Sequence, residues 1–206
     1  MKSPVATLVL LLAGICAAVE PEEALAGSAR FVRGAGAVSV SFELEQAYST
    51  GATSSQKGTL LLGDAVRFRL KMPGMTLVSD GKTYWEHREA SKQVLVRNVS
   101  DLPAGFQPAK MLFQYLECRP LSATTTKEKK GELVRLELDP TGRMGNLAEL
   151  TVWLKPKTWA PARIRAKDLS GNVATYELTS LKTGAKTSPS DFVYAKTEGV
   201  DEIDMR

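Results

Sequence analysis

The sequence predicts a mainly β protein, with one antiparallel sheet that is strongly curved or closed into a barrel. Apolar and polar residues alternate in many short segments, and this period of two is typical of half-buried strands. Gly, Pro, Asn and Asp residues separate the segments at short intervals, as they do in β-hairpins. About nine or ten short strands result, and this regular succession favours a barrel or a curved sheet. No helical segments alternate with the strands, so a dinucleotide-binding βαβ fold is excluded.

The strands are recognised by apolar residues at every second position. Val38, Val40, Phe42 and Leu44 alternate with Ser and Glu. The same period recurs in residues 66–71, 94–97, 133–138, 150–154 and 162–167. Turn residues lie between the segments, at 63–64, 73–74, 80–81, 139–142 and 170–172. Each segment therefore presents one apolar face to a core and one polar face to water.

An N-terminal segment has helical spacing instead. Residues 22–33 place Leu25, Ala29 and Val32 on one face. Acidic residues come first and basic residues last, as the helix dipole favours. Gly34 follows and is expected to end this helix.

A second helical segment interrupts the strands in the middle of the chain. Residues 108–116 begin with Pro108, which suits a first helical turn, and carry an apolar stripe. We expect this helix to lie across the sheet. The residues that follow, 121–131, are rich in Thr and Lys and are expected to form an exposed loop.

The composition excludes several classes of function. The chain has 206 residues, 27 Lys and Arg, 23 Asp and Glu, one His and two Cys. This size fits one globular domain, which we place at residues 19–206. The net charge of +4, without dense basic runs, argues against nucleic acid as a partner. One His and two Cys cannot supply a metal-ligand cluster or an ordinary hydrolytic triad. We therefore expect that the protein is not an enzyme and binds no metal and no cofactor.

The first 18 residues have the pattern of a secretory signal peptide. Lys2 precedes an uncharged apolar run at 5–15, and small residues follow. The run is too short for a membrane-spanning helix. We place cleavage after Ala18, with Ala26 as the alternative. Attachment of lipid to Cys16 is a further alternative, although a small residue does not precede this cysteine.

His87 and Cys118 have reactive side chains, but each has a structural interpretation that is simpler than a catalytic role. His87 is interpreted as a surface residue, although it follows a carboxylate. Cys118 ends an apolar helical segment and is interpreted as a packed thiol. No nucleophile elbow, phosphate-binding loop or dinucleotide fingerprint occurs in the sequence.

Basic residues line one face of two predicted strands. They are Arg67, Arg69 and Lys71 on one strand and Arg163, Arg165 and Lys167 on the other. Such stripes keep a sheet soluble and prevent edge pairing. Docking on acidic partners or on anionic headgroups is the other interpretation, and the sequence leaves it open.

The apolar strand faces and the central helix also allow two arrangements. A curved sheet covered by a helix encloses an apolar cavity in some proteins. A core filled entirely by side chains is the alternative, and the residue pattern alone does not decide between them.

Several motifs together resemble the periplasmic outer-membrane lipoprotein carrier family, LolA. The most specific is Asp80-Gly81-Lys82-Thr83-Tyr84-Trp85, which lies within residues 76–85 and is followed by Gln93-Val94. Other similar pieces occur in the family's order, at residues 42–46, 57–60, 159–161, 168–172 and 198–204. The similarity extends from about Glu22 to Asp204, which is most of the chain.

The resemblance implies a fold and a function. The fold is an unclosed antiparallel β-barrel, a curved half-barrel sheet, with short helices as a lid over an apolar cavity. Members of the family shelter the acyl chains of lipoproteins and carry them across the periplasm. The implied partners are lipoproteins, an inner-membrane ABC transporter that releases them and an outer-membrane receptor that accepts them. We expect a monomer in the periplasm.

Alternation and the resemblance together define a candidate cavity. Its expected lining is Val40, Phe42, Leu44, Leu60, Leu62, Phe68, Leu70, Val94, Val96, Leu136, Leu150, Val152, Ile164 and Tyr176. Its expected lid consists of Met111, Leu112, Tyr115 and Leu116. A lipid-sensing regulatory module, or a lipid-anchored receptor on the same fold, is the alternative function.

One departure from the family concerns the strand before the motif. Many members carry an Arg there that helps to hold the lid. Residues 62–65 are Leu-Gly-Asp-Ala in this chain, so no latch residue is transferred.

Overall fold

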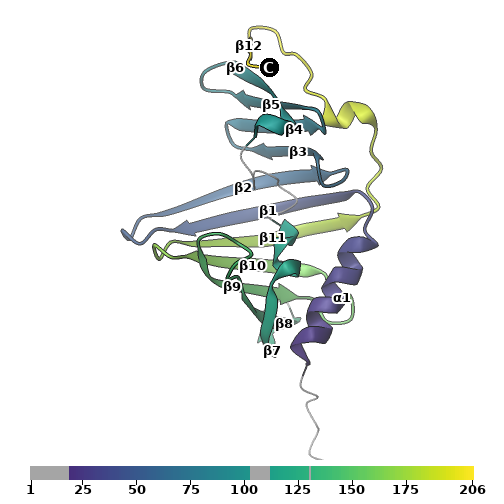
Figure 1. Cartoon of the computed structure of the whole chain (residues 1–206), viewed down its shortest axis with the longest axis vertical. Coiled ribbons are helices and arrows are strands. Elements are labelled where there is room, and N and C mark those ends of the chain that lie inside the picture. The colour runs from purple at the N-terminus through teal and green to yellow at the C-terminus, as the bar shows by residue number, and fades with distance from the viewer. Residues whose placement is uncertain (1–18, 103–111, 130) are drawn as a thin grey trace, which may run out of the picture.

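The twelve strands of the described residues form a single sheet that does not close into a barrel. The structure is a computed structural model that describes residues 19–102, 112–129 and 131–206. The strand order is β12-β6-β5-β4-β3-β2-β1-β11-β10-β9-β8-β7, so the sheet has two free ends (Figure 1). The expected mainly β, open antiparallel architecture is confirmed. The signal peptide expected at residues 1–18 lies outside the described residues.

The first half of the sheet follows the chain as a series of hairpins. Its strands are β1 (Val38–Ala47), β2 (Thr53–Leu62), β3 (Arg67–Met72), β4 (Met75–Asp80), β5 (Thr83–Arg88) and β6 (Gln93–Asn98). The second half comprises β7 (Arg119–Glu128), β8 (Gly131–Asp139), β9 (Leu147–Leu154), β10 (Pro161–Asp168) and β11 (Val173–Thr183). Antiparallel pairing of β11 with β1 joins the halves. Among the described strands, only the short β12 (Asp201–Asp204) pairs in parallel, beside β6.

Two strands were not expected from the sequence. Residues 121–128 of the expected exposed loop belong to β7, which pairs with β8 on one side. The β-branched threonines of this segment suit such an edge strand. All four residues of β12 are exposed and lack alternation, so the period of two was absent there.

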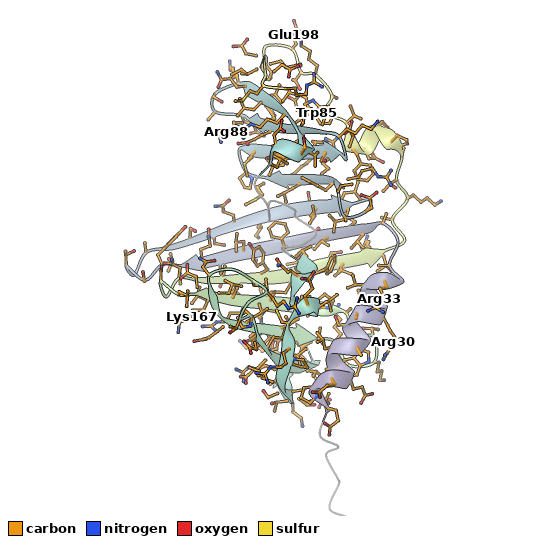
Figure 2. All side chains as sticks on the ribbon, viewed as in Figure 1. Arg30, Arg33, Trp85, Arg88, Lys167 and Glu198 are labelled. Carbon is orange, nitrogen blue, oxygen red and sulfur yellow. The ribbon has the colours of Figure 1, made fainter. Side chains whose placement is uncertain are left out.

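The N-terminal helix α1 (Pro21–Arg33) confirms the helical prediction. Pro21 opens it, Glu22 and Glu23 lie in its first turn, and Arg30 and Arg33 lie in its last turn. Figure 2 labels both arginines along α1. α1 packs against β7, β8 and η2 (Gln114–Glu117), the 3-10 helix of the central segment. None of the helices in the described residues is long and apolar enough to cross a membrane.

The sheet has two differently covered faces. We call the face against which α1 and η2 pack the inner face and the opposite one the outer face. One core cluster combines Ala24 of α1 and Leu112 with apolar residues from strands across the sheet. This core lies on the inner face.

On the outer face, the C-terminal strap, residues 188–194, crosses β3 and β4. The strap contains η3 (Pro189–Phe192), whose Phe192 is buried. A Cβ atom at Gly63 would lie 2.7 Å from Cζ of Phe192, so the close approach of this ring needs a glycine. Figure 1 shows the C-terminal segment running beside the sheet before β12 joins β6.

Candidate functional site

An apolar row crosses five neighbouring strands on the inner face. Leu136 of β8 lies opposite Val152 of β9, which lies opposite Ile164 of β10. Ile164 in turn faces Tyr176 of β11, and Tyr176 faces Leu44 of β1. Directly opposed residues share a face, so the pairing alone places the row on one surface. The four aliphatic residues are at most 8% exposed, and Tyr176 is partly buried against them.

A second apolar row continues across the first half of the sheet. Val40 lies opposite Leu60, Leu60 opposite Leu70, and Leu70 opposite Leu77. All four are at most 6% exposed. The two rows meet on β1, where Val40 and Leu44 share a face.

The remaining expected lining residues of this region join the same face. Leu62 and Phe68 oppose one another next to the second row, and Leu150 lies beside Val152 on β9. The ring centroids of Phe42 and Tyr176 are 5.9 Å apart in an edge-to-face arrangement. The inner face therefore brings together Val40, Phe42, Leu44, Leu60, Leu62, Phe68, Leu70, Leu136, Leu150, Val152, Ile164 and Tyr176.

Val94 and Val96 do not lie with this set. Val96 pairs with Trp85, which pairs with Val78, and Val78 pairs with Arg69, which points away from the core. Val94 shares that outer face. Both valines are only 1% exposed, so they are apolar residues buried on the outer face and not on the inner face. We therefore leave them out of the candidate lining.

The structure describes three of the four expected lid residues. Leu112 and Tyr115 are almost fully buried, and Leu116 packs partly buried against the core. Met111 lies outside the described residues. The Tyr115 hydroxyl lies 2.5 Å from the Ser28 hydroxyl, a buried hydrogen bond that ties η2 to α1. Burial also raises the pKa of the Tyr115 phenol above its ordinary value.

Sequence reasoning missed several inner-face residues. Leu77 extends the second row, and Leu178 lies opposite Phe42. Val134, Leu138 and Leu154 flank the first row on β8 and β9. Val134, Leu138 and Leu154 lie in alternating segments, so the period of two was a sufficient signal for these three, whereas buried residues are consecutive around Leu77.

The basic stripe on β3 makes specific contacts. The Arg69 guanidinium donates to the backbone carbonyls of Asp191 and Val193 at 2.7 and 2.8 Å, which anchors the strap. Arg67 pairs with Asp64 at 2.7 Å and lies over the Phe192 ring. Two of the three stripe residues on β3 thus serve the fold.

The second stripe, on β10, is paired with carboxylates. Arg163 donates two hydrogen bonds to Glu128 at 2.8 and 3.0 Å and also pairs with Glu177. Arg165 and Lys167 both pair with Glu149. This stripe is therefore largely neutralised within the chain.

One hollow among the described residues has a charged lining. It has a volume of about 720 Å³, and its walls include Glu43, Glu128, Glu132 and Arg163. Its charged lining contrasts with the apolar rows of the inner face. The inner face is therefore the more apolar of these two surfaces.

Cys118 and His87 both pack against other parts of the fold. Cys118 is a free, buried thiol in the core, and burial raises its pKa, which disfavours the nucleophilic thiolate. His87 is half-buried on the outer face, and its ring centroid is 5.5 Å from that of Tyr194 in the strap. The described residues contain no cluster of three or more His, Cys, Asp or Glu able to hold a metal.

A solved structure shares this fold. An uncharacterized conserved protein from Thermus thermophilus matches with a TM-score of 0.57 and 14% identity, over 89% of this chain and 98% of that chain. A putative outer membrane lipoprotein-sorting protein domain from Vibrio parahaemolyticus has a TM-score of 0.45 and 13% identity, over 84% and 97%. A LolA superfamily protein from Nitrosomonas europaea has a TM-score of 0.44 and 11% identity, over 86% and 99%.

Sequence comparison identifies the family. No curated protein matches the chain. The family model described as outer membrane lipoprotein carrier protein LolA matches residues 33–195, which is well over half of the sequence. This match includes the strands of both apolar rows. The chain therefore belongs to the LolA family of outer membrane lipoprotein carrier proteins.

Proposed function

We propose that this protein is a non-catalytic periplasmic carrier that binds the acyl chains of lipoproteins against the inner face of its sheet. The observation that carries the proposal is the continuity of the two apolar rows, which meet on β1 and extend from β8 to β4. Membership of the LolA family supports the same cargo.

The binding energy of such a carrier is hydrophobic. Each buried methylene contributes about 0.8 kcal/mol, so one long chain is held without a charged contact. Release then needs a competing apolar surface or a movement of the helices that cover the inner face. We propose that Leu112, Tyr115 and Leu116 belong to this movable cover, together with Met111.

The proposal includes export and two docking partners. The first 18 residues act as a cleaved signal peptide, and residues 19–206 form one monomeric domain. An inner-membrane ABC transporter loads the carrier and an outer-membrane receptor unloads it.

The test is to purify the exported protein from periplasm and to identify bound molecules by native mass spectrometry and lipid extraction. Leu70→Glu places a charge in the second row and should abolish co-purification of triacylated lipoprotein. Lys71→Glu is the matched control, because Lys71 is the next residue along β3 and is exposed on the outer face.

A second variant separates loss of binding from loss of folding. Leu70→Trp adds bulk without burying a charge and should reduce the amount of bound lipoprotein while the circular dichroism spectrum stays unchanged. A wild-type protein that is empty, and that takes no lipoprotein from inner-membrane vesicles, would refute the carrier function. A lipid-sensing module would then be the better hypothesis.

A further inference from the structure

The inner face changes from apolar to polar on β5 and β6. Phe68 of β3 lies opposite Ser79, Ser79 opposite Tyr84, and Tyr84 opposite Arg97 of β6. All four residues therefore share the inner face, and the last is a cation. Figure 1 places β5 and β6 in the upper part of the sheet, far from α1. An apolar surface with one polar end matches the shape of an amphiphile.

The acidic residue of this polar end already has partners. Glu86, next to Tyr84 along the inner face, pairs with Arg88 at 2.6 Å. Burial and the nearby Glu86 carboxylate raise the pKa of the Tyr84 phenol above its ordinary value. Glu86 is thus neutralised by Arg88, whose side chain is labelled in Figure 2 near the end of β5.

Arg97 is the cation of this cluster whose charge is not matched. Among the described residues, no carboxylate forms an ion pair with Arg97, and its Nε–H group is buried without a hydrogen-bond acceptor. A buried donor on a charged group is costly when it has no acceptor, so such groups are normally paired. The guanidinium is a planar fork that suits carboxylate and phosphate groups.

We infer that Arg97 binds the anionic head group of an amphiphile whose acyl chain lies along the apolar rows of the inner face. The inference goes beyond the proposed function, because the lipid anchor of a lipoprotein carries neither a carboxylate nor a phosphate next to its acyl chains, and it adds a second class of ligand for the same face. The shared chemistry is a carboxylate or phosphate attached directly to the apolar part. Because the charged end lies on β5 and β6, the acyl chain extends from there toward β1.

The experiment compares charged and uncharged ligands of equal chain length on the purified exported protein. Palmitate is compared with hexadecanol, and dipalmitoyl phosphatidate with dipalmitoylglycerol, each by displacement of a bound pyrene-labelled alkane. Wild-type protein should bind the anionic member of at least one pair about tenfold more tightly. A preference in the first pair identifies a carboxylate, and a preference in the second identifies a phosphate.

Arg97→Gln should remove the preference and leave binding of the uncharged ligands unchanged, which also demonstrates that the variant folds. Arg135→Gln is the matched control, because Arg135 lies on the outer face of β8 and pairs with Glu137. Equal affinities in wild type, or a preference that persists in Arg97→Gln, overturn the inference and leave the carrier function intact. Binding of none of the four ligands overturns both.

Discussion

The contact between Ser28 and Tyr115 shows how much one residue pair contributes to the cover of the inner face. Both side chains are buried, and their hydroxyl oxygens are 2.5 Å apart. Tyr115→Phe should lower the free energy of unfolding by about 1–2 kcal/mol, because the Ser28 hydroxyl is left buried without a partner. Urea denaturation measures this change.

A double-mutant cycle tests whether the hydrogen bond itself is responsible. Ser28→Ala combined with Tyr115→Phe removes both polar groups, so the double variant should be less destabilised than the sum of the single variants, by about 1 kcal/mol. Simple additivity would contradict the assignment of this energy to the hydrogen bond.

The sequence could predict one partner of this pair and not the other. Helical spacing placed Tyr115 and Leu116 on one apolar face of the central segment, and the structure buries both against the core. Ser28 lies 87 residues earlier, and no local period relates positions so far apart. Arg97 has the same limitation, since only the strand register reveals that it shares a face with Tyr84.

At the scale of elements, the C-terminal strap depends on one arginine of β3. Arg69 donates to two strap carbonyls, so Arg69→Met should leave these acceptors without their charged donor. We expect amide hydrogen exchange in residues 188–194 to accelerate by about tenfold, with β8 and β9 unchanged. Exchange is measured by mass spectrometry.

Lys71→Met is the control for this prediction. Lys71 lies on the same outer face of β3 and is exposed, so its replacement removes a similar charge without touching the strap. Equal acceleration in both variants would mean that charge, and not the two hydrogen bonds, holds the strap.

The burial of β6 explains why alternation assigned Val94 and Val96 to the inner face. A period of two separates the faces of a strand, but it identifies the core face only when the other face is in water. On β6 the outer face is the more buried one, because Val94 and Val96 are 1% exposed while Leu95 and Arg97 on the inner face are half-buried. Elsewhere, as in β1 and β9, the outer face is more polar and the predicted faces match the structure.

For the whole molecule, the residue pattern predicted an antiparallel sheet and the family resemblance predicted that it is unclosed, but neither predicted the strand order. Local hairpins account for the neighbours β1 to β6 and β7 to β11. The pairing of β1 with β11 joins residues at least 126 positions apart, as between Ala47 and Val173, and the parallel β12 has no apolar pattern. Long-range pairings of this kind depend on complementary faces across the sheet, which no single segment encodes.

Three tyrosines link the stability of the whole molecule to alkaline pH. Tyr84, Tyr115 and Tyr176 all lie on the inner face, and burial raises the pKa of each phenol above 10.0. The folded state therefore favours the neutral phenol, and this stabilisation is fully present below pH 10 and is lost as pH rises, because only the unfolded chain releases the protons. In the pH range where the unfolded chain has released a proton that the folded state keeps, the free energy of unfolding should fall by roughly 1.4 kcal/mol per pH unit for that group. Urea denaturation at a series of pH values above 10 measures the slope, and Tyr115→Phe should make it shallower by roughly 1.4 kcal/mol per pH unit. An unchanged slope in that variant would show that Tyr115 does not contribute.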